Sequence, residues 1–195
     1  MTFSDLYKGL TRLGYYLFSF EDIMTLYPGE KRDNLKNMLH RWKEKGWVYT
    51  LKKGLYEMNY PDDPGIPDMR IANVLYSPSY VSLETALSHY NIIPEVAVSV
   101  TSVTTKPTRT FRNRHGLFTY HTVRPGAFAG YYVMKERKFD ILIAEPEKAL
   151  VDYLHFADVR NERIDKKVVS KLNRGKIMRY AALYKMDWGK IYADL

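Results

Sequence analysis

Basic residues are concentrated in a segment of the chain that contains no acidic residue. From Val96 to Lys135 the sequence has no Asp or Glu. The basic residues of the segment are Lys106, Arg109, Arg112, Arg114, Arg124 and Lys135. Strands disfavour acids, which explains their absence but not the gathering of positive charge. Because alternation along a strand places several of these residues on one sheet face, we expect a surface that attracts an anionic partner.

A second basic group lies on a helical stretch, "EKRDNLKNMLHRWKEKG". Leu35, Met38, Leu39 and Trp42 fall at i, i+3, i+4 and i+7 and form one apolar face. The remaining positions and the following "KKG" turn carry Lys31, Arg32, Asn34, Lys36, Asn37, His40, Arg41, Lys52 and Lys53. Arg and Lys bind guanine O6 and N7, Asn pairs with adenine, and a turn lysine suits phosphate. These nine residues are therefore candidate DNA contacts, although a lysine-rich and arginine-rich face is also common on plain solvated helices.

Two acids lie near the start of this helix. Glu30 and Asp33 favour its N-terminal dipole but would weaken contact with DNA.

Patterns typical of catalysis are missing from the sequence. The chain has no cysteine, which excludes thiolate ligands and a cysteine nucleophile. His89, His115, His121 and His155 form no i, i+4 pair beside a carboxylate, so no metal site is expected. There is no glycine-rich phosphate loop and no G-x-S-x-G motif. We expect neither an enzyme nor a bound cofactor.

One stretch is similar to the acid–acid–lysine set of metal-dependent nucleases. Asp140 is followed by Glu145, Glu147 and Lys148, but Pro146 stands two residues before the lysine, where that set has an acid. The acids and the lysine are better interpreted as the start of a helix with Pro146 at its first position.

The elements that carry the helical basic group predict a winged helix-turn-helix domain over residues 1–60. Two helices precede the basic one, with Ser4 and Ser19 as expected N-caps and a break at Pro28-Gly29. Gly46 is a suitable residue to end the third helix. Two β-rich runs around "KKG" follow, and three helices with such a ribbon are typical of this domain.

The acid-free segment lies in a second, mixed α/β domain. "PDDPGIPD", at 61–68, is rich in proline and acids and predicts a linker, so we assign 61–78 to a linker and connecting helix and 79–195 to the second domain. Helices are expected at "SLETALSHYN", capped by Ser82, at "EPEKALVDYLHF", and in two pieces split near Gly175. Strands are expected at 96–105, at "LFTYHTV" and within 131–145. The fold class is α+β.

Composition agrees with a polyanionic partner and a cytoplasmic location. The chain of 195 residues has a formal net charge of +8 and a pI near 9.4. No stretch approaches the ~18 apolar residues of a membrane span, and the N-terminus is not typical of a signal peptide.

Three motifs together resemble the AbiE-type (AbiEi) antitoxins of bacterial type IV toxin–antitoxin and abortive-infection systems. They are "SLETAL", "TSVTTKPTRTF" and "PEKALVDYL", and the resemblance covers about Leu6 to Leu183. One departure is Asn91, where the family pattern has glycine after the helix; Asn tolerates the same left-handed backbone.

The resemblance implies a transcriptional autorepressor that binds inverted repeats in its own promoter. It also implies antitoxin activity against a nucleotidyltransferase toxin, without requiring a stable complex. We expect a monomer that binds double-stranded operator DNA cooperatively and does not bind membranes. The family's C-terminal basic surface carries over only to Lys106, Arg109 and Arg112, with Arg114 beside them. Two alternatives stay open: a DNA-binding regulator or basic protein-interaction module without antitoxin activity, and a nuclease.

Overall fold

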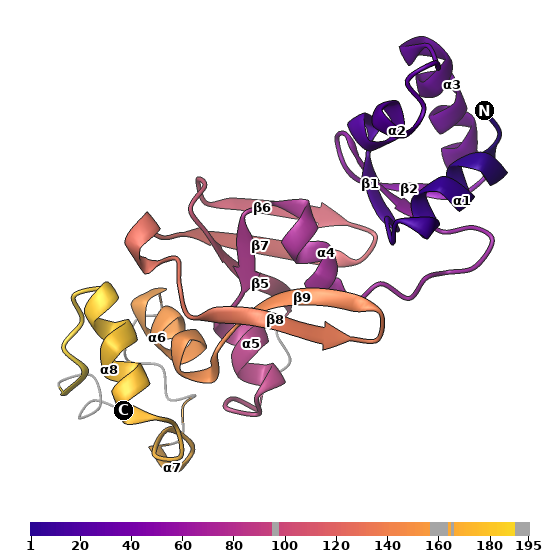
Figure 1. Cartoon of the computed structure of the whole chain (residues 1–195). Coiled ribbons are helices and arrows are strands. Elements are labelled where there is room, and N and C mark those ends of the chain that lie inside the picture. The colour runs from indigo at the N-terminus through magenta and orange to yellow at the C-terminus, as the bar shows by residue number, and fades with distance from the viewer. Residues whose placement is uncertain (95–97, 157–163, 165, 190–195) are drawn as a thin grey trace. The chain divides into compact units, whose positions relative to one another are not determined.

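The computed structural model describes residues 1–94, 98–156, 164 and 166–189 (Figure 1). The chain divides into two compact units, Met1–Pro67 (unit 1) and Asp68–Leu195 (unit 2). The division lies inside the proline-rich segment 61–68. The architecture is mixed α+β.

Unit 1 contains three helices and a three-stranded antiparallel sheet of order β1-β3-β2. Its elements in chain order are α1 (Phe3–Arg12), β1 (Leu17–Ser19), α2 (Phe20–Leu26), α3 (Arg32–Glu44), β2 (Val48–Lys52) and β3 (Leu55–Met58). One core joins all three helices to the sheet and includes the fully buried Leu6, Ile23 and Leu35. The buried face of α3 is the predicted stripe.

Local sequence chemistry sets the helix ends of unit 1. Ser19 and Asp22 form the expected capping box of α2, with reciprocal bonds of 2.6 and 3.1 Å. The expected N-cap at Ser4 is wrong: α1 begins one residue after Thr2, which forms a capping box with Asp5. Thr2 has an acid three residues later, as that box requires. Gly46 has a φ of +68° and ends α3, as expected.

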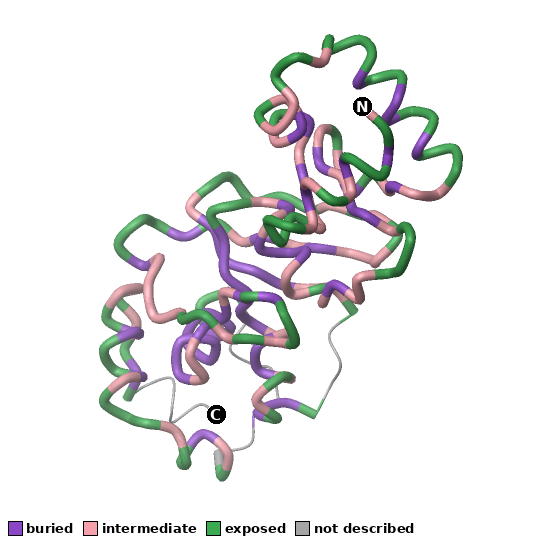
Figure 2. Tube along the Cα trace, turned by 45° about the vertical axis from the view of Figure 1, so that its right-hand side comes forward, coloured by how far each residue is buried: buried purple, intermediate pink, exposed green. Residues whose placement is uncertain are grey.

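Unit 2 is built on a six-stranded mixed sheet of order β6-β7-β5-β4-β9-β8. Its strands are β4 (Ser79–Val81), β5 (Ser99–Thr104), β6 (Arg109–Asn113), β7 (Gly116–Thr122), β8 (Tyr131–Glu136) and β9 (Phe139–Ala144). The central strands β4 and β5 are largely buried (Figure 2). The first two residues of the predicted strand 96–105 lie outside the described residues.

Helices cover both faces of this sheet. They are α4 (Asp68–Leu75), α5 (Leu83–His89), α6 (Pro146–Phe156), α7 (Lys166–Val169) and α8 (Arg174–Leu183), with a 3₁₀ turn at Pro125–Ala127. On one face, Tyr120 of β7 donates to the Ala72 carbonyl of α4 at 2.7 Å. On the other, Tyr80 of β4 donates to Asp152 of α6 at 3.1 Å. The helix expected within the connecting segment 61–78 is therefore part of unit 2.

The end of α5 confirms that Asn91 adopts the left-handed backbone that asparagine tolerates. Asn91 has a φ of +56°. Its N–H donates to the Ser88 carbonyl at 3.0 Å, and the N–H of Ile92 donates to the Leu87 carbonyl at 2.8 Å. This pair of bonds is the Schellman arrangement.

Among the described residues, no helix has the length and apolar character needed to cross a bilayer.

Candidate nucleic-acid interface

The nine residues predicted to contact DNA gather on α3, at its N-cap and on the β2–β3 turn. We call this group the α3 surface. Eight of its side chains are exposed and Lys52 is half-buried. They stay outside because Leu35, Met38, Leu39 and Trp42 fill the core beneath them. A helix of 13 residues is about 20 Å long, so these donors are spread along one rod.

Helical geometry divides the α3 surface into two flanks. With about 3.6 residues per turn, Arg32 and Lys36 fall on one flank of the helix. Asn34 and Arg41 fall on the opposite flank. Between the flanks lie Asp33, Asn37 and His40. The exposed face therefore has hydrogen-bond donors at both edges and an acid near its start.

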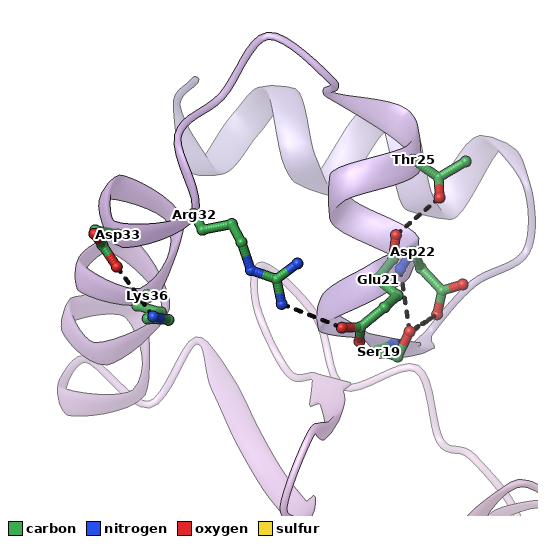
Figure 3. Close-up of polar contacts among 7 residues, drawn as sticks. All are labelled: Ser19, Glu21, Asp22, Thr25, Arg32, Asp33 and Lys36. Carbon is green, nitrogen blue, oxygen red and sulfur yellow. Dashed lines mark hydrogen bonds and ion pairs between the residues drawn. The ribbon is translucent and has the colours of Figure 1, made fainter.

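Both acids at the beginning of α3 have positively charged partners. Glu30 accepts a bond of 2.6 Å from the amino group of Met1. Asp33 accepts a bond of 3.0 Å from Lys36, one turn further along the helix (Figure 3). Their repulsion toward an anionic ligand is therefore reduced.

Arg32 has contacts with two residues of α2. Its guanidinium lies 4.9 Å from the centre of the Phe20 ring. Its Nη2 atom lies 3.4 Å from Oε1 of Glu21 (Figure 3). No other side-chain partner of Arg32 lies in the described part of the chain. Most of the guanidinium donors therefore stay open to solvent.

A tight turn between β2 and β3 carries Lys53 and directly follows Lys52, the last residue of β2. Lys52 pairs with Leu55 across the hairpin, which leaves Lys53 and Gly54 as the turn residues. Gly54 has a φ of +81°, which a side chain would disfavour. Lys53 is exposed at the tip.

The basic residues of the acid-free segment do not form one face. Lys106 lies 5.3 Å above the ring of Tyr76, and Arg109 lies 5.6 Å from the ring of Phe111. Tyr76 and Phe111 contact each other at 5.4 Å on the α4 side of the sheet. We call these four residues the β6 surface. Arg112 lies three positions after Arg109 on β6, so it faces the opposite side of the sheet.

Position on the sheet separates the other basic residues too. Arg114 lies in the β6–β7 turn. Arg124 donates to the Leu183 carbonyl at the end of α8. Lys135 pairs with Asp140 at 2.7 Å. Lys106 and Arg109 are therefore the two basic residues that share a face, and strand alternation and the turns separate the others from them.

Strand β6 lies at one edge of the six-stranded sheet. Pro107 lies between β5 and β6 and cannot donate to a ladder. β6 pairs with β7 alone, in the order β6-β7-β5. The segment free of acids in sequence also meets an acid from a distant part of the chain, since His115 of the turn lies 3.3 Å from Asp68 of α4.

The acids and lysine considered for nuclease chemistry have separate structural partners. Asp140 pairs with Lys135, whereas Glu147 accepts a bond of 3.0 Å from the backbone N–H of Asn173. Lys148 pairs with Asp152 inside the unit. Within the described ranges, no group of three or more His, Asp or Glu side chains is arranged to hold a metal ion.

A buried polar cluster was not expected from the sequence. Lys148 and Asp152, both with 0% side-chain exposure, form an ion pair one turn apart on α6. Asp152 also accepts from Tyr80 at 3.1 Å and from Ser82 at 2.7 Å, and Tyr184 contacts both charged groups. Burial lowers the pKa of Lys148 and raises the pKa of Tyr184.

This cluster also changes the role of Ser82. The serine precedes α5 as expected, but its side chain forms no capping bond to that helix. Its hydroxyl binds Asp152 instead. The i, i+4 spacing of Lys148 and Asp152, with only apolar residues between them, was the available signal for the cluster.

Comparison of the sequence with models of known protein families and with curated proteins gives no match.

Proposed function

We propose that unit 1 is a winged helix-turn-helix domain that binds double-stranded operator DNA. In this proposal α3 enters the major groove and the β2–β3 hairpin acts as the wing. The observation that carries it is the α3 surface: one helix buries its apolar stripe and presents Arg, Lys, Asn and His side chains outward. The exposed Lys53 at the hairpin tip supports a phosphate contact beside the groove.

Pairing of the acids supports the same proposal. Glu30 and Asp33 lie where they would repel phosphate, but each has a positive partner in the structure. The formal net charge of +8 adds a long-range attraction to nucleic acid.

We further propose that the whole chain is a cytoplasmic antitoxin and autorepressor of the AbiE type, acting against a nucleotidyltransferase toxin. The motifs that resemble that family support this proposal. The β6 surface is the part of unit 2 that we assign to antitoxin activity, because its two exposed cations lie together on one face. Arg112, which the resemblance also implies, lies on the opposite face of the sheet, and Arg114 lies in the β6–β7 turn.

The test of the repressor role is a competition binding assay with the full chain. The probe is the duplex immediately upstream of its own reading frame, and the competitor is random duplex of equal length at ~150 mM salt. We expect a preference of about 10³-fold or more for the upstream duplex. Equal affinity for both duplexes would contradict the repressor role.

The test of the antitoxin role is co-expression with the product of the neighbouring downstream reading frame. We expect that product to arrest growth alone and to be harmless with the full chain present. Failure to protect, with DNA binding intact, would favour the second candidate: a DNA-binding regulator whose β6 surface recognises some other anionic partner.

A further inference from the structure

Arg32 is held on a rigid platform at the start of α3. Phe20, beneath it, is a core residue with 8% exposure. Glu21, beside it, belongs to the first turn of α2, whose N-terminus the Ser19–Asp22 capping box holds. The Glu21 carbonyl also accepts a bond of 2.9 Å from Thr25 (Figure 3). The ring and the carboxylate that contact Arg32 therefore have a fixed backbone.

The contact with Glu21 restrains Arg32 but leaves most of its N–H donors available to a ligand. Glu21 engages one terminal nitrogen through one oxygen, at 3.4 Å. The guanidinium carries five N–H donors in a planar fork, so a free edge with two parallel donors remains. The side chain is 59% exposed, and that of Glu21 is 70% exposed. A ligand can therefore reach the guanidinium while both α2 contacts persist.

We propose that Glu21 and Phe20 are positioning residues that orient Arg32 toward guanine. The proposal rests on the DNA-binding function of unit 1. It follows that the operator contains a G·C pair. Arg32 binds the O6 and N7 atoms of its guanine in the major groove. A guanidinium is suited to this bidentate contact, and a fork fixed in advance loses less conformational entropy when it forms.

Lys36 and Asp33 form a natural comparison on the same helix. They too are an exposed ion pair, joined at 3.0 Å, but the ammonium is a single charge on a flexible stem. Asp33 can change how strongly α3 attracts DNA. Its partner Lys36 has no planar fork, and no aromatic ring of the described residues lies beneath the Lys36 ammonium.

The test compares Glu21→Gln with Asp33→Asn, two changes that each remove one negative charge and keep the side-chain shape. A preferred duplex is first selected with the wild-type chain from a random duplex library. Each variant is then assayed against that duplex and against copies with every G·C pair changed in turn. Thermal unfolding by circular dichroism checks that both variants fold.

We expect both variants to bind all duplexes about 2–5-fold more tightly, because each loses an exposed acid near phosphate. Of the two variants, only Glu21→Gln lowers discrimination at one G·C pair. We expect a loss of about 3–10-fold, smaller than the full discrimination of a bidentate contact, because Arg32 itself is still present. Arg32→Lys also lowers discrimination at the same pair, because lysine can bind guanine but has no planar fork for Glu21 to orient.

Equal discrimination by the two charge variants would overturn the positioning role of Glu21. Discrimination lost at every pair alike would do so too, because it would indicate general loosening of α3. If the wild-type chain selects no preferred duplex, the DNA-binding function itself fails. If the wild-type chain does select a preferred duplex and Glu21→Gln leaves that preference unchanged, only the positioning role of Glu21 fails.

Discussion

The two units use positive charge in different ways. On α3 of unit 1, Arg32 and Lys36 each contact an exposed acid nearby. On the β6 surface of unit 2, Lys106 and Arg109 lie over aromatic rings. The fully buried ion pair of unit 2, Lys148 and Asp152, lies inside the core.

The exposed pairs, the cations over rings and the buried pair have different physical effects. An exposed pair contributes little to stability but restrains the direction of a side chain. A cation over a ring keeps its charge free to attract an anionic partner. A buried pair strongly penalises the loss of either partner. The exposed pairs of unit 1 therefore suit the orientation of side chains toward a ligand. In unit 2 the cations of the β6 surface can attract a partner, whereas the buried pair serves stability.

The largest expected effect comes from breaking the buried pair. Asp152→Ala leaves Lys148 without its counter-ion, and we expect unit 2 to lose about 3–5 kcal/mol of its free energy of unfolding. Hydrogen exchange of unit 2 peptides during a denaturant series measures this loss. Asp33→Ala, which breaks an exposed pair in unit 1, is the control and should cost less than about 1 kcal/mol. If the two variants lost equal free energies of unfolding, the expected difference between the buried and the exposed ion pair would be contradicted.

Charge reversal on β6 has the next largest expected effect. Arg109→Glu places an acid on the β6 surface, and we expect loss of protection in co-expression with the downstream product. Arg112→Glu makes the same change of charge on the opposite sheet face and should keep most of the protection. Operator binding should change by less than about 3-fold in both variants, because we assign the proposed DNA binding to unit 1. Equal loss of protection in both would show that the face does not matter.

Truncation of the hairpin lysine has a smaller, uniform effect. Lys53→Ala removes the proposed phosphate contact, so we expect about 2–5-fold weaker binding to every duplex, with no change in sequence preference. The slope of log K against log salt should become shallower by about 1. A selective loss at one base pair would instead place Lys53 against a base.

The smallest effect is a dependence of unit 2 stability on pH. Partial burial acts to raise the pKa of Glu145, but hydrogen bonds from Lys176 and Tyr180 outweigh it and leave the pKa below its usual value. The ionised group therefore stabilises unit 2 above the unfolded pKa of about 4.3, and this contribution is lost as the pH falls through the folded pKa. The stability difference between wild type and Glu145→Gln should shrink between pH 6 and pH 3. A constant difference would show that Glu145 acts through packing alone.

Local signals predicted much of the fold. The capping box at Ser19, the glycine that ends α3 and the left-handed Asn91 depend on neighbours in sequence, and all three occur in the structure. The apolar stripe of α3 likewise located its exposed face.

What the sequence did not show depends on contacts between distant residues. The strands β1 and β4 are three residues long, too short for a periodic pattern. The hydroxyl of Ser82 binds a carboxylate 70 residues away. The division of Arg109 from Arg112 required knowing that both lie on the single strand β6. The sequence shows where the basic residues lie along the chain. Which of them share a face of the sheet depends on the strands and turns of the folded unit.

The central claim, that α3 reads DNA in the major groove, is tested most directly by guanine N7 methylation interference. The assay uses the selected duplex with the wild-type chain and with Arg32→Ala. The account predicts a guanine whose methylation blocks the wild-type chain, and the loss of that interference, with about 5–100-fold weaker binding, in Arg32→Ala. Identical interference patterns for the two chains, or no interference at any guanine, would contradict it.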